Sequence, residues 1–177
     1  VNVADLSDPG NLAEGAVWKT RTGVIGGVGI TVSIAERLAF ASGVRFVQKG
    51  MNPYWYYATI TVTNNYFEIP LYLTYDLLNF GSILAVEAGP SLGILLSSNS
   101  EGFIRDVGYE SFDTKADYKT YDVTLDCGLS LRTPVTETLG IVITGAYSHG
   151  IVNVQQIDSR AQSRDVRVMV GVSYALE

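Results

Sequence analysis

Apolar and polar residues alternate along most of this chain with a period of two, the pattern of a β-strand that has one apolar face. From Val24 onward the alternation predicts seven strands, and residues 1–6 predict part of an eighth. The seven segments are residues 24–34, 38–49, 66–77, 84–97, 121–132, 139–151 and 165–176. Few segments show the 3.6-residue period of a helix, so the sequence predicts an all-β fold.

The connections between these strands add independent information, because short and long connections alternate. The short ones are residues 36–37, 78–82 and 134–138, and the long ones are residues 7–19, 50–65, 99–119 and 153–163. Outer-membrane β-barrels combine short periplasmic turns with long extracellular loops, and each strand needs about 9–11 residues to cross. We therefore predict one domain over residues 1–177, an eight-stranded antiparallel up-and-down transmembrane β-barrel in the bacterial outer membrane. We expect its first strand to be partly missing from this chain and both termini to lie in the periplasm.

The two strand faces differ in a way that indicates which one meets lipid. The polar face is dominated by Gly, Ala, Ser and Thr, which suits a narrow barrel interior, and the other face is nearly all Val, Ile, Leu and aromatic. We expect Val28, Ile69, Leu125 and Val168 to face the lipid bilayer. The alternative is a soluble calycin-like or lipocalin-like barrel that binds an apolar small molecule, in which these four residues would line the cavity.

Aromatic residues gather near the predicted strand ends, as the two interfacial girdles of a membrane barrel would. Chance clustering in a β-rich protein is the alternative. The aromatic residues are Trp18, Tyr54, Trp55, Tyr56, Tyr57, Tyr118 and Tyr121 on the long-loop side, and Phe40, Tyr75, Phe80 and Tyr174 on the short-turn side.

Five charged residues fall near mid-strand on the polar face, so a closed barrel should bring them to similar depth. They are Arg45, Glu68, Glu87, Asp126 and Arg167. An isolated charge in so confined a place would cost several kcal/mol, so we expect these groups to pair. Eight strands leave an interior that side chains just fill. A structural ion network that plugs the lumen is therefore favoured over a proton or ion pathway, and a general pore is not expected.

Two local irregularities are expected in the sheet. The parity of the apolar positions slips near Asn64 and Asn65, which predicts a bulge or turn. Pro70 and Pro90 remove ladder hydrogen bonds and lie at similar distances from the 78–82 turn, so we expect them within a rung or two of each other, at a gap or bulge.

The net charge and the small numbers of cysteine and histidine exclude several classes of binding site. The net charge of −6 and pI of 4.7 have the wrong sign for a protein that binds nucleic acid through phosphate contacts. One cysteine, Cys127, and one histidine, His149, are too few for a disulfide or a structural zinc or iron–sulfur site. We expect no metal and no cofactor.

Several short motifs resemble those of the PorT-like outer-membrane β-barrel family, with matching order and spacing. They are Tyr66-Phe67-Glu68-Ile69-Pro70-Leu71, Glu87-Ala88-Gly89-Pro90-Ser91-Leu92-Gly93, Tyr147-Ser148-His149-Gly150-Ile151 and Val170-Gly171-Val172-Ser173-Tyr174. The resemblance implies an eight-stranded barrel in the Gram-negative outer membrane, in a group often labelled porin family, and it brings no catalytic residues. Ala146 stands where family members often carry Arg, so the interior charges must balance differently here.

Ser148 and His149 invite comparison with outer-membrane hydrolases that modify lipids. Adjacent strand residues point to opposite faces, so these two cannot form a nucleophile–base pair. We therefore expect no enzymatic activity and place His149 at the rim or interface of the barrel.

The connection 99–119 is the better functional candidate. It mixes aromatic and charged residues, and its candidate contact residues are Phe103, Arg105, Tyr109, Phe112 and Tyr118. Such a composition suits contact with a surface protein or glycan at the cell surface. A solvated hairpin extension without a partner is the alternative.

Overall fold

The computed structural model describes residues 1–7, 17–55, 58–105, 108–155 and 162–175, which form ten strands and one 3₁₀ turn. The strands are β1 (Asn2–Ser7), β2 (Val17–Gly23), β3 (Ile25–Ala35), β4 (Leu38–Trp55), β5 (Ala58–Asn79), β6 (Ile83–Ile104), β7 (Gly108–Asp113), β8 (Tyr121–Pro134), β9 (Leu139–Gly150) and β10 (Gln162–Tyr174). The 3₁₀ turn η1 covers Lys115–Asp117. No helix in these ranges is long and apolar enough to cross a membrane.

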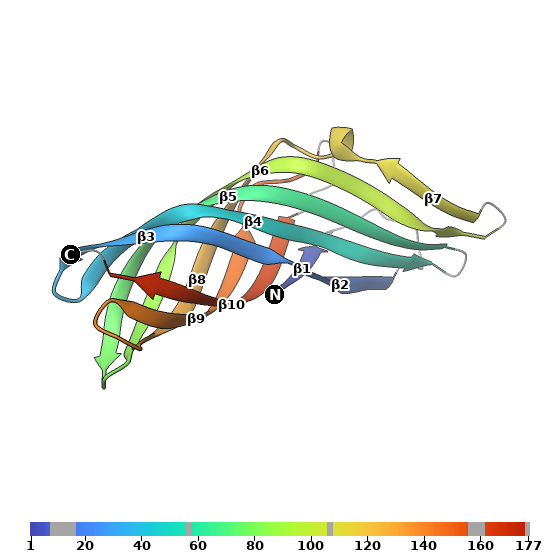
Figure 1. The fold of residues 1–177 in the computed structure, drawn as a ribbon. Helices are drawn as coiled ribbons and strands as arrows, with labels where there is room; N and C mark the ends of the chain where they lie inside the picture. The colour runs from blue at the N-terminus through green and yellow to red at the C-terminus, as the bar shows by residue number, and fades with distance from the viewer. Residues whose placement is uncertain (8–16, 56–57, 106–107, 156–161, 176–177) are drawn as a thin grey trace.

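The strands form one antiparallel sheet that closes on itself (Figure 1). The ring runs β2-β1-β10-β9-β8-β6-β5-β4, and pairing between β2 and β4 completes it. This ring of eight strands confirms the predicted fold class, and β1 confirms the eighth strand expected at the N-terminus.

β1 covers only part of the ring's height. It pairs with β10 from Asn2 to Ser7, opposite residues 162–167, while β10 continues to Tyr174. β3 continues the line of β2 and pairs along β4. At the short-turn end, the described residues therefore include no strand that pairs with both β3 and β10.

The strands on one side of the ring are longer than the sequence predicts. Residues 50–65 and 99–119 were expected as loops, but β4 and β5 continue through Trp55 and from Ala58, and β6 and β7 form a further hairpin. A register shift between Asn65 and Tyr66 confirms the predicted bulge and lets the ladder continue. Figure 1 shows the β4–β7 ends projecting beyond the rest of the ring.

The expected irregularity at the two prolines is also confirmed. Pro70 pairs with Ser91, next to Pro90, and the next pair down the ladder is Leu73 with Ala88. Gly89 lies in this gap, where a Cβ atom would come within 2.0 Å of the Leu71 carbonyl oxygen.

The exposed surface of the ring is apolar, and much of its interior is polar. Val28, Leu125 and Val168 are 75%, 56% and 52% exposed, and Ile69 is half-buried. Buried polar and charged residues outnumber buried hydrophobic ones among the described residues. The barrel is thus inside-out relative to a soluble protein, so the lipocalin-like alternative is wrong.

The predicted aromatic girdle is present at the short-turn end. Its members Phe40, Tyr75, Phe80 and Tyr174 are all exposed. At the other end Tyr121 is exposed and Tyr118 is buried, which corrects the placement of Tyr118 in a girdle. The predicted girdle residues Trp18, Tyr54, Trp55, Tyr56 and Tyr57 lie outside the residues whose side chains the structure describes.

Candidate functional site

A cluster of ion pairs crosses the lumen, and Arg45 of β4 lies at its centre. Arg45 pairs with Glu68, its register neighbour on β5, with 2.9 Å between Nη2 and Oε2. The same Nη2 lies 2.7 Å from Oδ2 of Asp126 on β8. Its guanidinium also lies over the Tyr72 ring, at 5.6 Å from the ring centroid. One arginine thus joins three strands through charge-assisted contacts.

Arg167 of β10 joins the cluster from the other side and is fully buried. Its Nη1 lies 3.2 Å from Glu68 Oε2 and 3.1 Å from Asp126 Oδ2. Its Nη2 lies 2.8 Å from Oδ2 of Asp165, two residues away on the same strand. Arg167 therefore contacts three carboxylates from three strands.

Lys49 of β4 extends the cluster toward the long-connection end. Its Nζ lies 2.8 Å from Glu68 Oε1, 2.8 Å from Asp122 Oδ2 and 3.5 Å from Asp165 Oδ2. Hydroxyl groups complete the cluster: Ser163 donates to Asp122, and Thr124 donates to Asp126, both at 2.8 Å.

Four of the five predicted network residues meet as expected, and Glu87 does not. Glu87 forms none of the ion pairs described, because its register partners Thr74 and Gly128 place it closer to the short-turn end than Asp126, which pairs with Gly89. Three members were missed: Lys49, Asp122 and Asp165. All three share the inward parity of the predicted members, which is the signal that could have found them.

An apolar cap lies beyond the ion network, at the long-connection end. It consists of buried Met51, Val62, Tyr66, Leu95, Tyr118 and Val154. The last two come from connections that hydrogen-bond to each other, since Lys119 N–H donates to the Val154 carbonyl. The hydroxyl of Tyr118 is buried in this cap, and burial raises its pKa. The predicted contact residue Tyr118 is therefore a packing residue, which corrects that part of the candidate surface.

The other predicted contact residues lie on the projecting β6–β7 hairpin. Phe103, Tyr109 and Phe112 are 58%, 67% and 54% exposed, and Arg105 is exposed in the turn. Phe103 and Tyr109 are register neighbours. The Tyr109 hydroxyl donates to Glu101 at 3.0 Å, a hydrogen bond that raises the pKa of Tyr109.

Comparison with known protein families identifies the class of barrel. The family model "Outer membrane protein beta-barrel domain" matches residues 1–156. The chain belongs to this family. It is an integral β-barrel of the Gram-negative bacterial outer membrane.

No curated protein matches the chain. Among solved structures, it is similar to Ail, the attachment invasion locus protein of Yersinia pestis, at 12% identity and a TM-score of 0.47. That match covers 98% of this chain and 91% of Ail.

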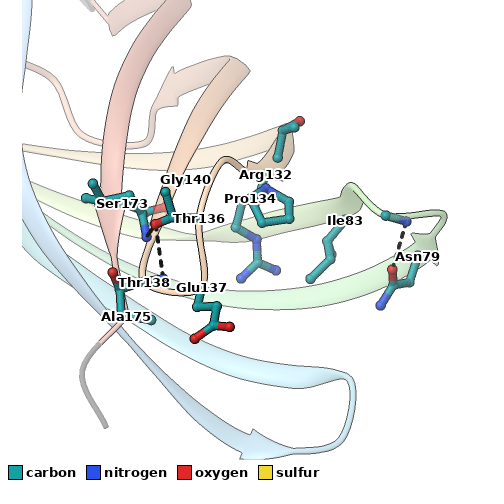
Figure 2. Close-up of a pocket in the computed structure, with 13 residues that line it drawn as sticks. Asn79, Ile83, Arg132, Pro134, Thr136, Glu137, Thr138, Gly140, Ser173 and Ala175 are labelled. Atoms are coloured by element: carbon teal, nitrogen blue, oxygen red, sulfur yellow. Dashed lines mark hydrogen bonds between the residues drawn. The ribbon is translucent and has the colours of Figure 1, made fainter.

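The short-turn end of this outer-membrane barrel has a hollow of about 270 Å³. Figure 2 shows its walls, which come from the β5–β6 turn, the β8–β9 turn and the end of β10. Arg132 borders it and pairs with Asp76, and both side chains are partly exposed. The hollow lies between the two turns and the end of β10, and both polar and apolar residues line it.

Ser148 and His149 point to opposite faces of β9, as predicted. Ser148 is fully buried toward the lumen, whereas His149 is half-buried on the outward face beside Tyr147. The two side chains therefore do not form a nucleophile–base pair.

Proposed function

We propose that this outer-membrane barrel is a closed scaffold that carries an interaction surface, without a conducting pore and without enzymatic activity. The observation that supports a closed lumen is the buried ion network, with the apolar cap beyond it. Arg45 and Lys49 of β4 pair with carboxylates of β8, and Arg167 of β10 pairs with Glu68 of β5 on the opposite side of the ring. The interior of an eight-stranded barrel has no spare width around such a cluster.

Conductance across a planar bilayer tests this proposal. The purified barrel, inserted at known density, should give no lasting ion-conducting steps. An Arg167→Ala variant, which removes a guanidinium shared by three carboxylates, should raise the frequency of brief openings. Stable, long-lived openings of the unmodified protein would refute the closed lumen.

The interaction surface that we propose is the β6–β7 hairpin. Its exposed Phe103, Tyr109 and Phe112 are large amphipathic or apolar groups of the kind enriched at protein interfaces. Among the described residues β7 pairs only with β6, so its other edge can accept an extended segment of a partner. A protein partner is therefore favoured over a glycan.

Shortening the hairpin tests the surface role. Replacing residues 103–112 by a two-residue turn should leave the barrel folded, as judged by its electrophoretic mobility with and without boiling. The shortened barrel should lose adhesion of expressing cells to protein-coated surfaces. A matched variant is the triple change Phe103→Ser, Tyr109→Ser and Phe112→Ser, which keeps both strands and removes only the exposed aromatic side chains. Unchanged adhesion of both variants would remove the hairpin from the proposal.

We further propose that the barrel belongs to the PorT-like group and that both termini lie in the periplasm. The short-turn end would then be periplasmic, and the β4–β7 projection would stand at the cell surface. This orientation agrees with the general arrangement of short turns and long connections in outer-membrane barrels. Protease treatment of intact cells should cut the projection and spare the 78–82 and 134–138 turns.

A further inference from the structure

A charged side chain, Arg164, lies at the long-connection end of the apolar outward face of β10. The outward positions Val166, Val168, Val170 and Val172 are between 52% and 78% exposed. Arg164 continues the same parity toward the long-connection end and is also exposed. It therefore lies where the apolar belt of the barrel ends.

Arg164 has a defined neighbourhood on this face. Its register partner on β9 is His149, and the next pair down is Val166 with Tyr147. The side chains of a directly opposed pair lie about 5 Å apart at Cβ, so Arg164 and His149 are side by side. Asp5 is the register partner of Arg164 on β1, outside the residues whose side chains are described.

The His149 ring is held in place by Tyr147. Their rings stack with centroids 6.3 Å apart, and the Tyr147 hydroxyl lies 3.4 Å from His149 Nδ1. When the hydroxyl donates to Nδ1, a neutral imidazole carries its proton on Nε2, which becomes a donor. The outward face thus presents two cationic or donor groups above Leu125 and Val166, both more than half exposed.

We propose that Arg164 and His149 form a binding site for the phosphate of a membrane lipid. The acyl chains that cover the apolar belt place their headgroups at its edge, which is where Arg164 lies. A guanidinium matches the geometry of a phosphate with paired N–H donors, and His149 Nε2 can add a third. Because the chain is acidic overall, with a net charge of −6, general electrostatic attraction does not explain such binding. The site is local, and the exposed Val166 and Leu125 supply contacts for the chain of the same lipid.

Titration of the folded barrel in a nonionic detergent with a soluble short-chain lipid tests the site. The probe is dihexanoyl phosphatidic acid, and dihexanoylglycerol and inorganic phosphate are titrated alongside it. Phosphatidic acid should bind more tightly than either. Arg164→Gln should weaken its binding by about fivefold, the effect of one basic residue at a charged membrane surface, and His149→Gln should weaken it less. Arg37→Gln, in the exposed turn at the opposite end, is the matched control and should leave binding unchanged.

Three results would overturn the proposal. Equal binding by the Arg164→Gln variant and the unmodified barrel would remove the site. Equal affinity for dihexanoylglycerol would show that only the apolar belt binds. Equal affinity for inorganic phosphate would show that Arg164 and His149 bind a free anion and not a lipid. Mobility with and without boiling shows that each variant is folded.

Discussion

Replacing Arg167 by methionine should destabilise the barrel more than any other single change in the lumen. Arg167 is fully buried and lies within 3.2 Å of Glu68, Asp126 and Asp165. Methionine keeps an unbranched apolar stem in place of the arginine stem and removes the guanidinium, so the loss is chiefly one of charge compensation. The network would then hold four carboxylates and two cations, instead of four and three.

The expected cost follows from the burial of these groups. Removing one partner of a buried ion pair typically costs about 3–5 kcal/mol, because the remaining charge is left uncompensated. The matched control is Arg132→Met. Arg132 pairs with Asp76, but their side chains are 29% and 27% exposed, and partly solvated pairs contribute about 1 kcal/mol or less.

Urea unfolding in lipid vesicles measures both variants, with the folded fraction read from unboiled electrophoresis. Adding Asp165→Asn to Arg167→Met should recover part of the loss, since it removes one uncompensated charge. Two results would contradict the reasoning. One is a loss of unfolding free energy in Arg167→Met that is no larger than the loss in Arg132→Met. The other is full additivity, in which Asp165→Asn lowers the unfolding free energy of the Arg167→Met barrel by as much as it lowers that of the unmodified barrel.

Three further predictions use the same unfolding assay or limited proteolysis. Ile143→Arg, on the outward face of β9, should lower the free energy of unfolding by about 2–4 kcal/mol, whereas Glu137→Arg in the exposed turn should change it little. Equal losses in the two variants would contradict a lipid-facing Ile143. Gly89→Ala should lower the free energy of unfolding by about 1–3 kcal/mol, because the added methyl group would clash with the Leu71 carbonyl oxygen. Gly26→Ala, where the methyl group would meet open space, should not lower it. A neutral Gly89→Ala would refute the close approach. Val154→Asp should place a charge in the apolar cap, detach it, and speed proteolytic cleavage near residues 151–155. Val152→Asp should speed this cleavage less, and equal cleavage rates in the two variants would count against the cap.

The alternation of the sequence predicts the strands and their faces well, because every membrane-crossing strand has one apolar and one small or polar face. It predicts the charged lumen residues less completely. Neighbouring strands of a barrel are staggered. Two inward residues that are equally far from the starts of their strands therefore lie at different heights along the barrel axis. Glu87 and Asp165 both have the inward parity. The register of the strands brings Asp165 to the ion network and places Glu87 closer to the short-turn end.

The sequence fails where strands leave the membrane. Residues 50–55 have no alternating apolar face and resemble a loop, and the alternation over residues 58–63 is short, yet both segments continue the β4–β5 ladder. Cross-strand hydrogen bonds maintain a strand in water without that pattern. The cap was missed for a related reason: Tyr118 and Val154 lie in connections, where no period marks them as buried.

The central claim is that the apolar strand faces meet lipid and that the opposite faces enclose a closed lumen. Single cysteines at the neighbouring positions Leu129 and Ser130 of β8, in a Cys127→Ser background, test it directly. Leu129 is 52% exposed and Ser130 is 3% exposed. In vesicles, a lipid-soluble maleimide should label Leu129→Cys, a charged water-soluble thiol reagent should not, and Ser130→Cys should react with neither until urea unfolds the barrel. Rapid reaction of folded Ser130→Cys with the charged reagent would show a water-filled lumen and contradict the account.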